Sequence, residues 1–173
     1  MTADSPRTIV LLRHAKADWP SVPDHERPLA DRGRHDSPAV GRRFLDDGIS
    51  LDLALCSTAE RTRETWKLAA HELPQRPRTV YEERLYEASL GELLALVNET
   101  PDDVGSLLLV GHNPGMHALA EALTGSAEGD TLTRMTRIGF PTAAFAVLTF
   151  TGSWKTVEHG VGRLTGFWTP HKG

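Results

Sequence analysis

Four short segments of this chain carry residues that could do chemistry, and each one follows an apolar stretch that is typical of a β-strand. The candidate residues in them are Arg13 and His14, Ser57 and Arg61, Glu87, and His112 and Asn113. The carboxyl ends of parallel strands meet at one edge of a sheet, so we expect these side chains to lie close together. Two histidines and two arginines around one point suit the binding of a phosphoryl group.

Each residue type in this set can serve phosphoryl transfer. A neutral imidazole can attack phosphorus, and His14 is the better candidate because Arg13 beside it offers a planar fork of donors to phosphate oxygens. Arg61 would supply a second fork from the first turn of a predicted helix. His112 could donate to a non-bridging oxygen, and Glu87 could protonate the leaving group.

The apolar stretches predict a mainly parallel sheet that positions these residues. Runs of aliphatic and β-branched residues without polar alternation are typical of parallel strands that are covered on both faces. The run SLLLV is the clearest of them. We predict strands at residues 8–12, 51–56, 78–82 and 106–110.

Helix signals follow these strands. Serine three residues before glutamate, as in Ser57 with Glu60 and in Ser89 with Glu92, has the spacing of a capping box. Serine or asparagine before proline is a further signal for a helix start. We predict helices at 38–47 with Gly48 as the stop, after Ser57, after Ser89, and after Asn113-Pro114 with Gly125 as the stop. Residues 16–37 read as a polar, irregular segment.

The last part of the chain predicts an antiparallel edge. Residues 143–150 and 153–159 flank Thr151-Gly152 and resemble the two strands of a hairpin. The fold class that we predict is therefore α/β, as a three-layer α/β/α sandwich with a mainly parallel central sheet and an antiparallel edge. At 173 residues we expect a single domain that spans 1–173.

Composition excludes several classes of partner. The formal charge of -4 gives no general attraction to nucleic acid or to anionic membranes. Cys56 is the only cysteine, which excludes an intramolecular disulfide and a cysteine-rich zinc site. The N-terminal MTADSPR has no apolar signal-peptide core, and no apolar run approaches the ~20 residues of a membrane span. We expect a cytoplasmic protein with neither nucleic acid nor a membrane as partner.

Four strings, taken in order, carry a family resemblance over residues 8–150. They are LLRHAKADW, RPLADRG (Arg27 to Gly33), STAERTRET and LLLVGHNPG. With these the chain resembles the histidine phosphatase superfamily, and in particular its SixA-like phosphohistidine phosphatase branch, which has a phosphoglycerate-mutase-like fold. The resemblance implies a covalent phosphohistidine at His14, a phosphate pocket from Arg13, Arg61 and His112, and neither metal nor cofactor.

The chain departs from the family pattern at two places. One is the loop after the first strand, and the other is the general acid that would protonate the leaving group. The superfamily usually has glycine where this chain has Ala15, which makes the loop less permissive. The SixA-like members differ from one another around the acid. Glu87 is carried over from its place in the Leu-Tyr-Glu string after the third strand, and Asp18 is the alternative. Asn113 is explained as a helix cap whose backbone N–H could still face the phosphate.

The resemblance implies a phosphatase, and its substrate is left open between two classes. The first choice is a phosphohistidine on a partner protein, because the chain is short and lacks insertions that would enclose a small metabolite. A phosphatase for small phosphomonoesters is the alternative within enzymes, and a non-catalytic module that binds a phosphorylated ligand is the alternative outside them. A mutase is disfavoured because its pocket must exclude water. A metal site at His112 and His117 is also disfavoured, because their spacing does not place them on one helical face.

Overall fold

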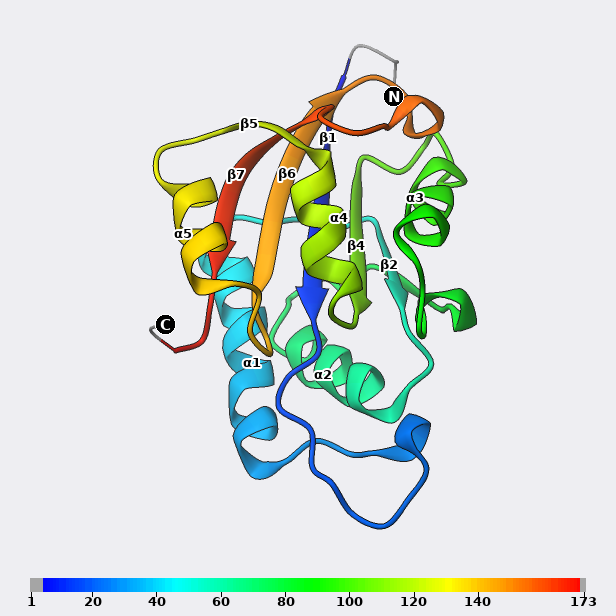
Figure 1. The fold of residues 1–173 in the computed structure, drawn as a ribbon, viewed down its shortest axis with the longest axis vertical. Coiled ribbons are helices and arrows are strands. Elements are labelled where there is room, and N and C mark those ends of the chain that lie inside the picture. The colour runs from blue at the N-terminus through cyan, green and yellow to red at the C-terminus, as the bar shows by residue number, and fades with distance from the viewer. Residues whose placement is uncertain (1–4, 172–173) are drawn as a thin grey trace.

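The computed structural model describes residues 5–171 and arranges the chain around one seven-stranded mixed sheet (Figure 1). The order of the strands in the sheet is β3-β2-β4-β1-β6-β7-β5. Their bounds are β1 Pro6–Arg13, β2 Leu53–Cys56, β3 Arg78–Tyr81, β4 Ser106–Gly111, β5 Thr124–Ala127, β6 Phe145–Thr151 and β7 Gly162–Trp168. The segment MTADSPR, in which we expect no signal-peptide core, is described only in part, because residues 1–4 lie outside the described part of the chain.

Helices cover both faces of this sheet. They are α1 Asp31–Asp46, α2 Glu60–Ala70, α3 Leu90–Asn98, α4 Gly115–Leu123 and α5 Thr131–Ile138, with short 3-10 helices η1 Asp24–Glu26, η2 Glu83–Leu85 and η3 Trp154–Thr156. Alternate residues of a strand point to opposite faces. In β1, Val10 and Leu12 join the core with α1 and α2, whereas Ile9 and Leu11 join the core with α3 and α4. The predicted three-layer α/β/α sandwich is confirmed.

The four predicted parallel strands are confirmed as β1 to β4, which pair in parallel with their neighbours. The strand predicted at 143–150 is β6, and it runs antiparallel to both β1 and β7. It lies inside the sheet, because β7 and β5 continue the sheet beyond it. β5 and β7 were not expected as strands, and neither was α5 as a helix.

The predicted hairpin partner at 153–159 is wrong, since the antiparallel partner of β6 is β7 at Gly162–Trp168. The segment after Thr151 instead folds into η3 because its tryptophan is drawn into the core. Trp154 is fully buried, and its indole N–H donates to the carbonyl of Val104 at 2.7 Å. The side-chain amide of Asn98 also donates to the carbonyl of Trp154, at 2.9 Å. Burial of one large side chain therefore overrides the local strand pattern.

The first helix begins earlier than the sequence predicts. It starts at Asp31, so the irregular segment predicted at 16–37 ends in helix, and Ser37 and Pro38 lie inside α1. Ser37 does not cap a helix, because its hydroxyl donates to the carbonyl of Gly33 one turn earlier, at 2.7 Å. Gly33 lies so close to the backbone of Lys16 that a Cβ there would overlap the Lys16 carbonyl. This tertiary contact fixes the first turn of α1.

The other helix signals have mixed outcomes. The capping box of Ser89 and Glu92 is confirmed at the start of α3, and Gly48 follows α1 with a φ of 69°. The capping box predicted from Ser57 is wrong, because α2 begins after Ala59 and the Ser57 hydroxyl is used elsewhere. Gly125 is not a helix stop but lies in β5, packed against the backbone of Gly160.

Over residues 5–171, the helices are all too short or too polar to cross a bilayer.

Candidate active site

The predicted site residues lie at or after the ends of the four parallel strands β1 to β4, at the end of the sheet toward which the β1 arrowhead points in Figure 1. Arg13 is the last residue of β1, and His14 follows it. The backbone N–H of His14 donates to the carbonyl of Gly111 at the end of β4, at 3.0 Å. This bond brings the β1 loop against the β4 loop, so that the ring centroids of His14 and His112 lie 5.3 Å apart.

His14 is a buried imidazole in a defined tautomer. Only 8% of the residue is exposed, and Nδ1 lies 2.7 Å from the carbonyl oxygen of Ala15. Because a carbonyl can only accept, Nδ1 carries the proton and Nε2 keeps its lone pair. Burial lowers the pKa of His14 to about 3, and the positive charges of Arg13 and Arg61 act in the same direction. The ring is therefore neutral and nucleophilic at neutral pH.

Three buried side-chain nitrogen atoms of the predicted site residues make no hydrogen bond with any described residue. They are Nε of Arg13, Nε of Arg61 and Nδ1 of His112. The two guanidinium groups are held by other contacts: Arg13 donates to the carbonyl of Phe140 at 3.0 Å, and Arg61 donates to the carbonyl of Asp24 at 2.8 Å. A buried donor without a partner is costly. Such a set of donors next to a neutral imidazole is suited to the oxygens of an anion.

His112 is held by a residue that the sequence had assigned to a cap. Its Nε2 lies 2.8 Å from the hydroxyl of the fully buried Ser57. When that hydroxyl donates to Nε2, the neutral ring carries its proton on Nδ1, the unpartnered atom. Burial, followed by the positive charge of Arg61, lowers the pKa of His112 to about 4. His112 is therefore a neutral hydrogen-bond donor at neutral pH.

Asp24 is a site residue that sequence reasoning missed, because it lies in the segment predicted to be irregular. Its carboxylate accepts from Arg61 at 3.1 Å, from Arg27 at 3.1 Å and from the hydroxyl of Tyr86. The Tyr86 hydrogen bond, followed by those of the two arginines, holds the pKa of Asp24 well below its ordinary value, and the same contact raises the pKa of Tyr86 to about 12. The one sequence signal that could have identified Asp24 is its spacing of three residues from Arg27, with which it forms an ion pair.

A pocket of about 380 Å³ opens beside His112 and contains one of the two candidate acids. Its lining includes Asp24, Arg61, Tyr86, Glu87, His112 and Met116. Glu87 has a φ of 56°, a left-handed conformation that non-glycine residues seldom adopt. Asp18, the alternative acid, is exposed and does not line this pocket; its carboxylate accepts from the backbone N–H of Trp19.

Asn113 differs from the other phosphate-binding candidates in that its side chain is already engaged. The amide donates to the carbonyl of Phe140 at 2.7 Å, and the amide oxygen accepts from the backbone N–H of His117 at 3.2 Å. Phe140 thus joins Asn113 to Arg13, which donates to the same carbonyl. The Asn113 side chain therefore orders the loop before α4, as expected of a residue at the start of a helix.

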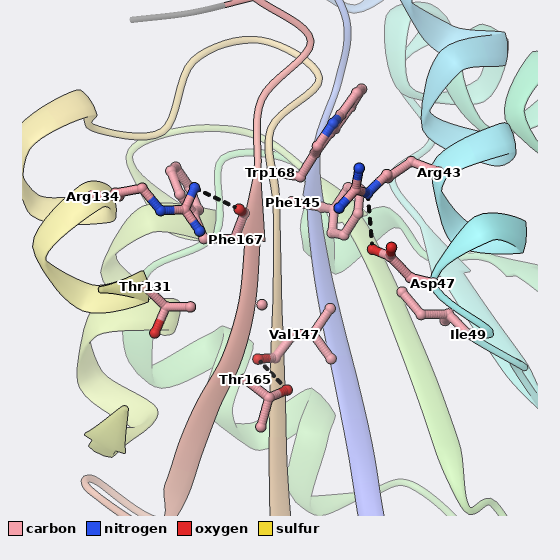
Figure 2. Close-up of a pocket in the computed structure, with 11 residues that line it drawn as sticks. Arg43, Asp47, Ile49, Thr131, Arg134, Phe145, Val147, Thr165, Phe167 and Trp168 are labelled. Carbon is pink, nitrogen blue, oxygen red and sulfur yellow. Dashed lines mark hydrogen bonds and ion pairs between the residues drawn. The ribbon is translucent and has the colours of Figure 1, made fainter. Parts of the chain in front are cut away.

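A second cavity, of about 390 Å³, lies on the sheet between α1 and α5 (Figure 2). Its two arginines are already engaged, since Arg43 pairs with Asp47 at 3.1 Å and Arg134 donates to the carbonyl of Phe167 at 3.1 Å. The predicted catalytic residues do not line it. Within residues 5–171, no three His, Cys, Asp or Glu side chains gather as ligands for a metal ion.

The buried neutral histidines predict a loss of stability in acid. The folded-state pKa values of His14 and His112, about 3 and 4, lie below the ordinary value of 6.5. Between about pH 6.5 and pH 3 the unfolded chain therefore binds more protons, so the free energy of unfolding falls as pH drops through that range. We expect His14→Gln to flatten this fall in urea unfolding measured from pH 8 to pH 4. His35→Gln, at an exposed position of α1, should leave the slope unchanged. Equal slopes for the parent and His14→Gln would contradict the prediction.

Comparison with known proteins agrees with this geometry. The sequence pattern of the histidine phosphatase superfamily (branch 1) matches residues 9–104. An uncharacterized protein of Mycobacterium tuberculosis (strain H37Rv) is 40% identical over 162 residues, which cover 92% of this chain and 99% of that protein.

Two solved structures whose names give them as candidate phosphohistidine phosphatases SixA are also similar. The protein from Nakamurella multipartitia is 30% identical with a TM-score of 0.82, over 96% of this chain and 97% of that chain. The protein from Agrobacterium tumefaciens is 33% identical with a TM-score of 0.80, over 96% of this chain and 99% of that chain. The chain therefore belongs to the histidine phosphatase superfamily, as a SixA-like, histidine-type phosphatase with the phosphoglycerate-mutase-like fold.

Proposed function

We propose that this phosphatase acts through a covalent phosphohistidine at His14 and uses no metal. One observation carries the proposal. The ring of the neutral, buried His14 lies 5.3 Å from that of His112, the charges of Arg13 and Arg61 act on it, and each of these three residues has a buried side-chain nitrogen without a partner in the described chain. Donors fixed in advance around a transferring phosphoryl group stabilise the charge that spreads over its oxygens.

The reaction has two steps in this proposal. In the first, Nε2 of His14 attacks phosphorus, and the bond from phosphorus to the leaving group breaks with its electron pair going to the leaving atom. Arg13, Arg61 and His112 hold the three non-bridging oxygens throughout. In the second, water attacks the same phosphorus, loses a proton to solvent or to a nearby base, and releases phosphate with regeneration of the neutral imidazole.

We infer that the substrate is a phosphohistidine on a partner protein, because the pocket is poor in proton donors for the leaving group. His112 is neutral at neutral pH, and Asp24 is held as a carboxylate, so neither is a strong acid there. Glu87 is the remaining candidate in the pocket. An imidazole that leaves from phosphorus needs far less protonation than an alkoxide does, so this site favours a phosphoramidate.

The test compares a phosphohistidine peptide with an alkyl phosphate, using the parent and Glu87→Gln. We expect the parent to favour the peptide, and the variant to lose at least about 10-fold on the alkyl phosphate but only a few-fold on the peptide. Glu83→Gln, an exposed glutamate on the neighbouring turn, should change neither rate. Equal losses on both substrates would refute the role of Glu87 as the general acid for the leaving group. A parent that favours alkyl phosphates would favour the alternative class, small phosphomonoesters.

A further inference from the structure

The pocket beside His112 has an unusual combination of side chains for an enzyme that takes an anionic phosphoryl group. Two carboxylates, those of Asp24 and Glu87, line it together with the apolar side chains of Leu85, Leu93 and Met116. Arg61 and His112, two of the proposed phosphate-binding residues, line the same pocket. The rest of the pocket is therefore the space next to the phosphoryl group, where the leaving group of a substrate would lie.

Asp24 is fixed in this pocket and yet accessible. Its carboxylate is held by Arg61, Arg27 and Tyr86, whereas 49% of its side chain remains exposed. A carboxylate offers about four lone-pair positions, and these three contacts leave room for one more donor. Asp24 thus presents a negative charge and a free acceptor position to whatever enters the pocket.

Tyr86, an aromatic residue that lines the same pocket, packs against two histidine rings. The ring of Tyr86 makes edge-to-face contacts with His25, at 4.9 Å between centroids, and with His112, at 5.5 Å. Edge-to-face geometry is the favourable arrangement for aromatic pairs. A planar ring that entered the pocket would find Tyr86 beside it and the Asp24 carboxylate within the same lining.

We propose that Asp24 is a specificity-determining residue of this phosphatase, one that accepts a hydrogen bond from the N–H of a leaving imidazole and disfavours leaving groups that carry negative charge. This rests on the proposed function. When the P–N bond breaks, its electron pair returns to the ring nitrogen that carried the phosphoryl group. The substrate must therefore bind with its other ring nitrogen already protonated from solvent; the Asp24 carboxylate accepts a hydrogen bond from that N–H, and the ring keeps the proton as it leaves. No proton has to be supplied by the enzyme.

A purely structural role for Asp24 would change the rates on the two classes of substrate in a different way. Asp24 also holds Arg61, through both its carboxylate and its backbone carbonyl. If that were its whole function, loss of the carboxylate would misplace a phosphate ligand and slow every substrate by the same factor. If Asp24 acts on the leaving group, the loss depends on which leaving group the substrate carries.

The experiment measures kcat/KM for phosphoimidazole and for p-nitrophenyl phosphate with the parent, Asp24→Asn and Tyr86→Phe. The first substrate releases an N–H-bearing ring, and the second releases an anion that needs no proton. We expect Asp24→Asn to lose about 10- to 100-fold on phosphoimidazole and to keep or gain activity on p-nitrophenyl phosphate. Tyr86→Phe keeps the charge and should change the ratio of the two rates less than threefold. Asp31→Asn, which removes a fully exposed carboxylate, should leave both rates unchanged.

The ratio of the two rates is independent of how much of a variant is folded, so a destabilised variant still gives an answer. An equal loss on both substrates would show that Asp24 acts only through Arg61 and would overturn the inference while leaving the proposed function standing. A parent enzyme that favours an alkyl phosphate over phosphoimidazole would instead contradict the proposed function, and the inference with it, before any variant is compared.

Discussion

Substitution of His14 by alanine is expected to abolish the phosphoenzyme and to lower kcat/KM by at least about 10⁴-fold, because it removes the proposed nucleophile. The proposed donors on Arg13, Arg61 and His112 remain in place, so the variant should still bind phosphate. The measurement is quenched-flow trapping with a labelled phosphoester, which detects covalent attachment whatever the physiological substrate is. The parent should show a burst of labelled protein, and the variant should show none.

The matched control for this prediction is another histidine. His35 is exposed on α1 and does not line the pocket beside His112, so His35→Ala should retain the burst and the rate. Label that still attaches to His14→Ala would mean that another residue is the nucleophile. A parent that binds phosphate but gives no labelled protein would favour a non-catalytic binding module.

Replacement of Arg61 by lysine is expected to lower kcat/KM by about 10²- to 10³-fold although the positive charge is kept. The planar guanidinium donates to Asp24 through its Nη atoms, and its buried Nε has no partner in the described chain and is left for a phosphate oxygen. An ammonium group cannot make both sets of contacts in that geometry. The measurement is steady-state hydrolysis of a phosphoester, together with inhibition by tungstate as a phosphate-like oxyanion, which should weaken in the variant.

Arg63 is the matched control, because it lies two residues further along the same helix and is exposed, with its guanidinium over the ring of Tyr81. Arg63→Lys should leave both measurements unchanged. Full activity in Arg61→Lys would show that a point charge is sufficient at this position and would remove the bidentate fork from the proposed mechanism.

The sheet and the proximity of the main site residues could be predicted from the sequence, because both depend on local patterns. Short continuous aliphatic runs are typical of strands covered on both faces, and parallel strands must place their following loops at one edge. The residues after the runs at 8–12, 51–56 and 106–110 therefore had to meet. The observed approach of the His14 and His112 rings follows from this geometry.

The errors occurred where a contact distant in sequence decided the outcome. Trp154 turns its segment into a 3-10 helix because the indole is buried against Val104. Gly33 packs on Lys16, and α1 therefore begins well before the Ser37-Pro38 signal. Serine serves equally as a cap or as a partner for a side chain, and only the position of His112 made Ser57 the latter.

The sequence by itself determined the layered α/β architecture and the residue types that gather around His14. Both follow from hydrophobic periodicity and from the succession of strands and helices along the chain, which are local properties of the sequence. Only the tertiary structure decided the tautomer and neutrality of His14, the partner of His112, and the place of Asp24 on Arg61. These depend on burial and on hydrogen bonds between segments up to 55 residues apart. Electrostatic properties of a site arise from distances in space, and a linear pattern does not contain those distances.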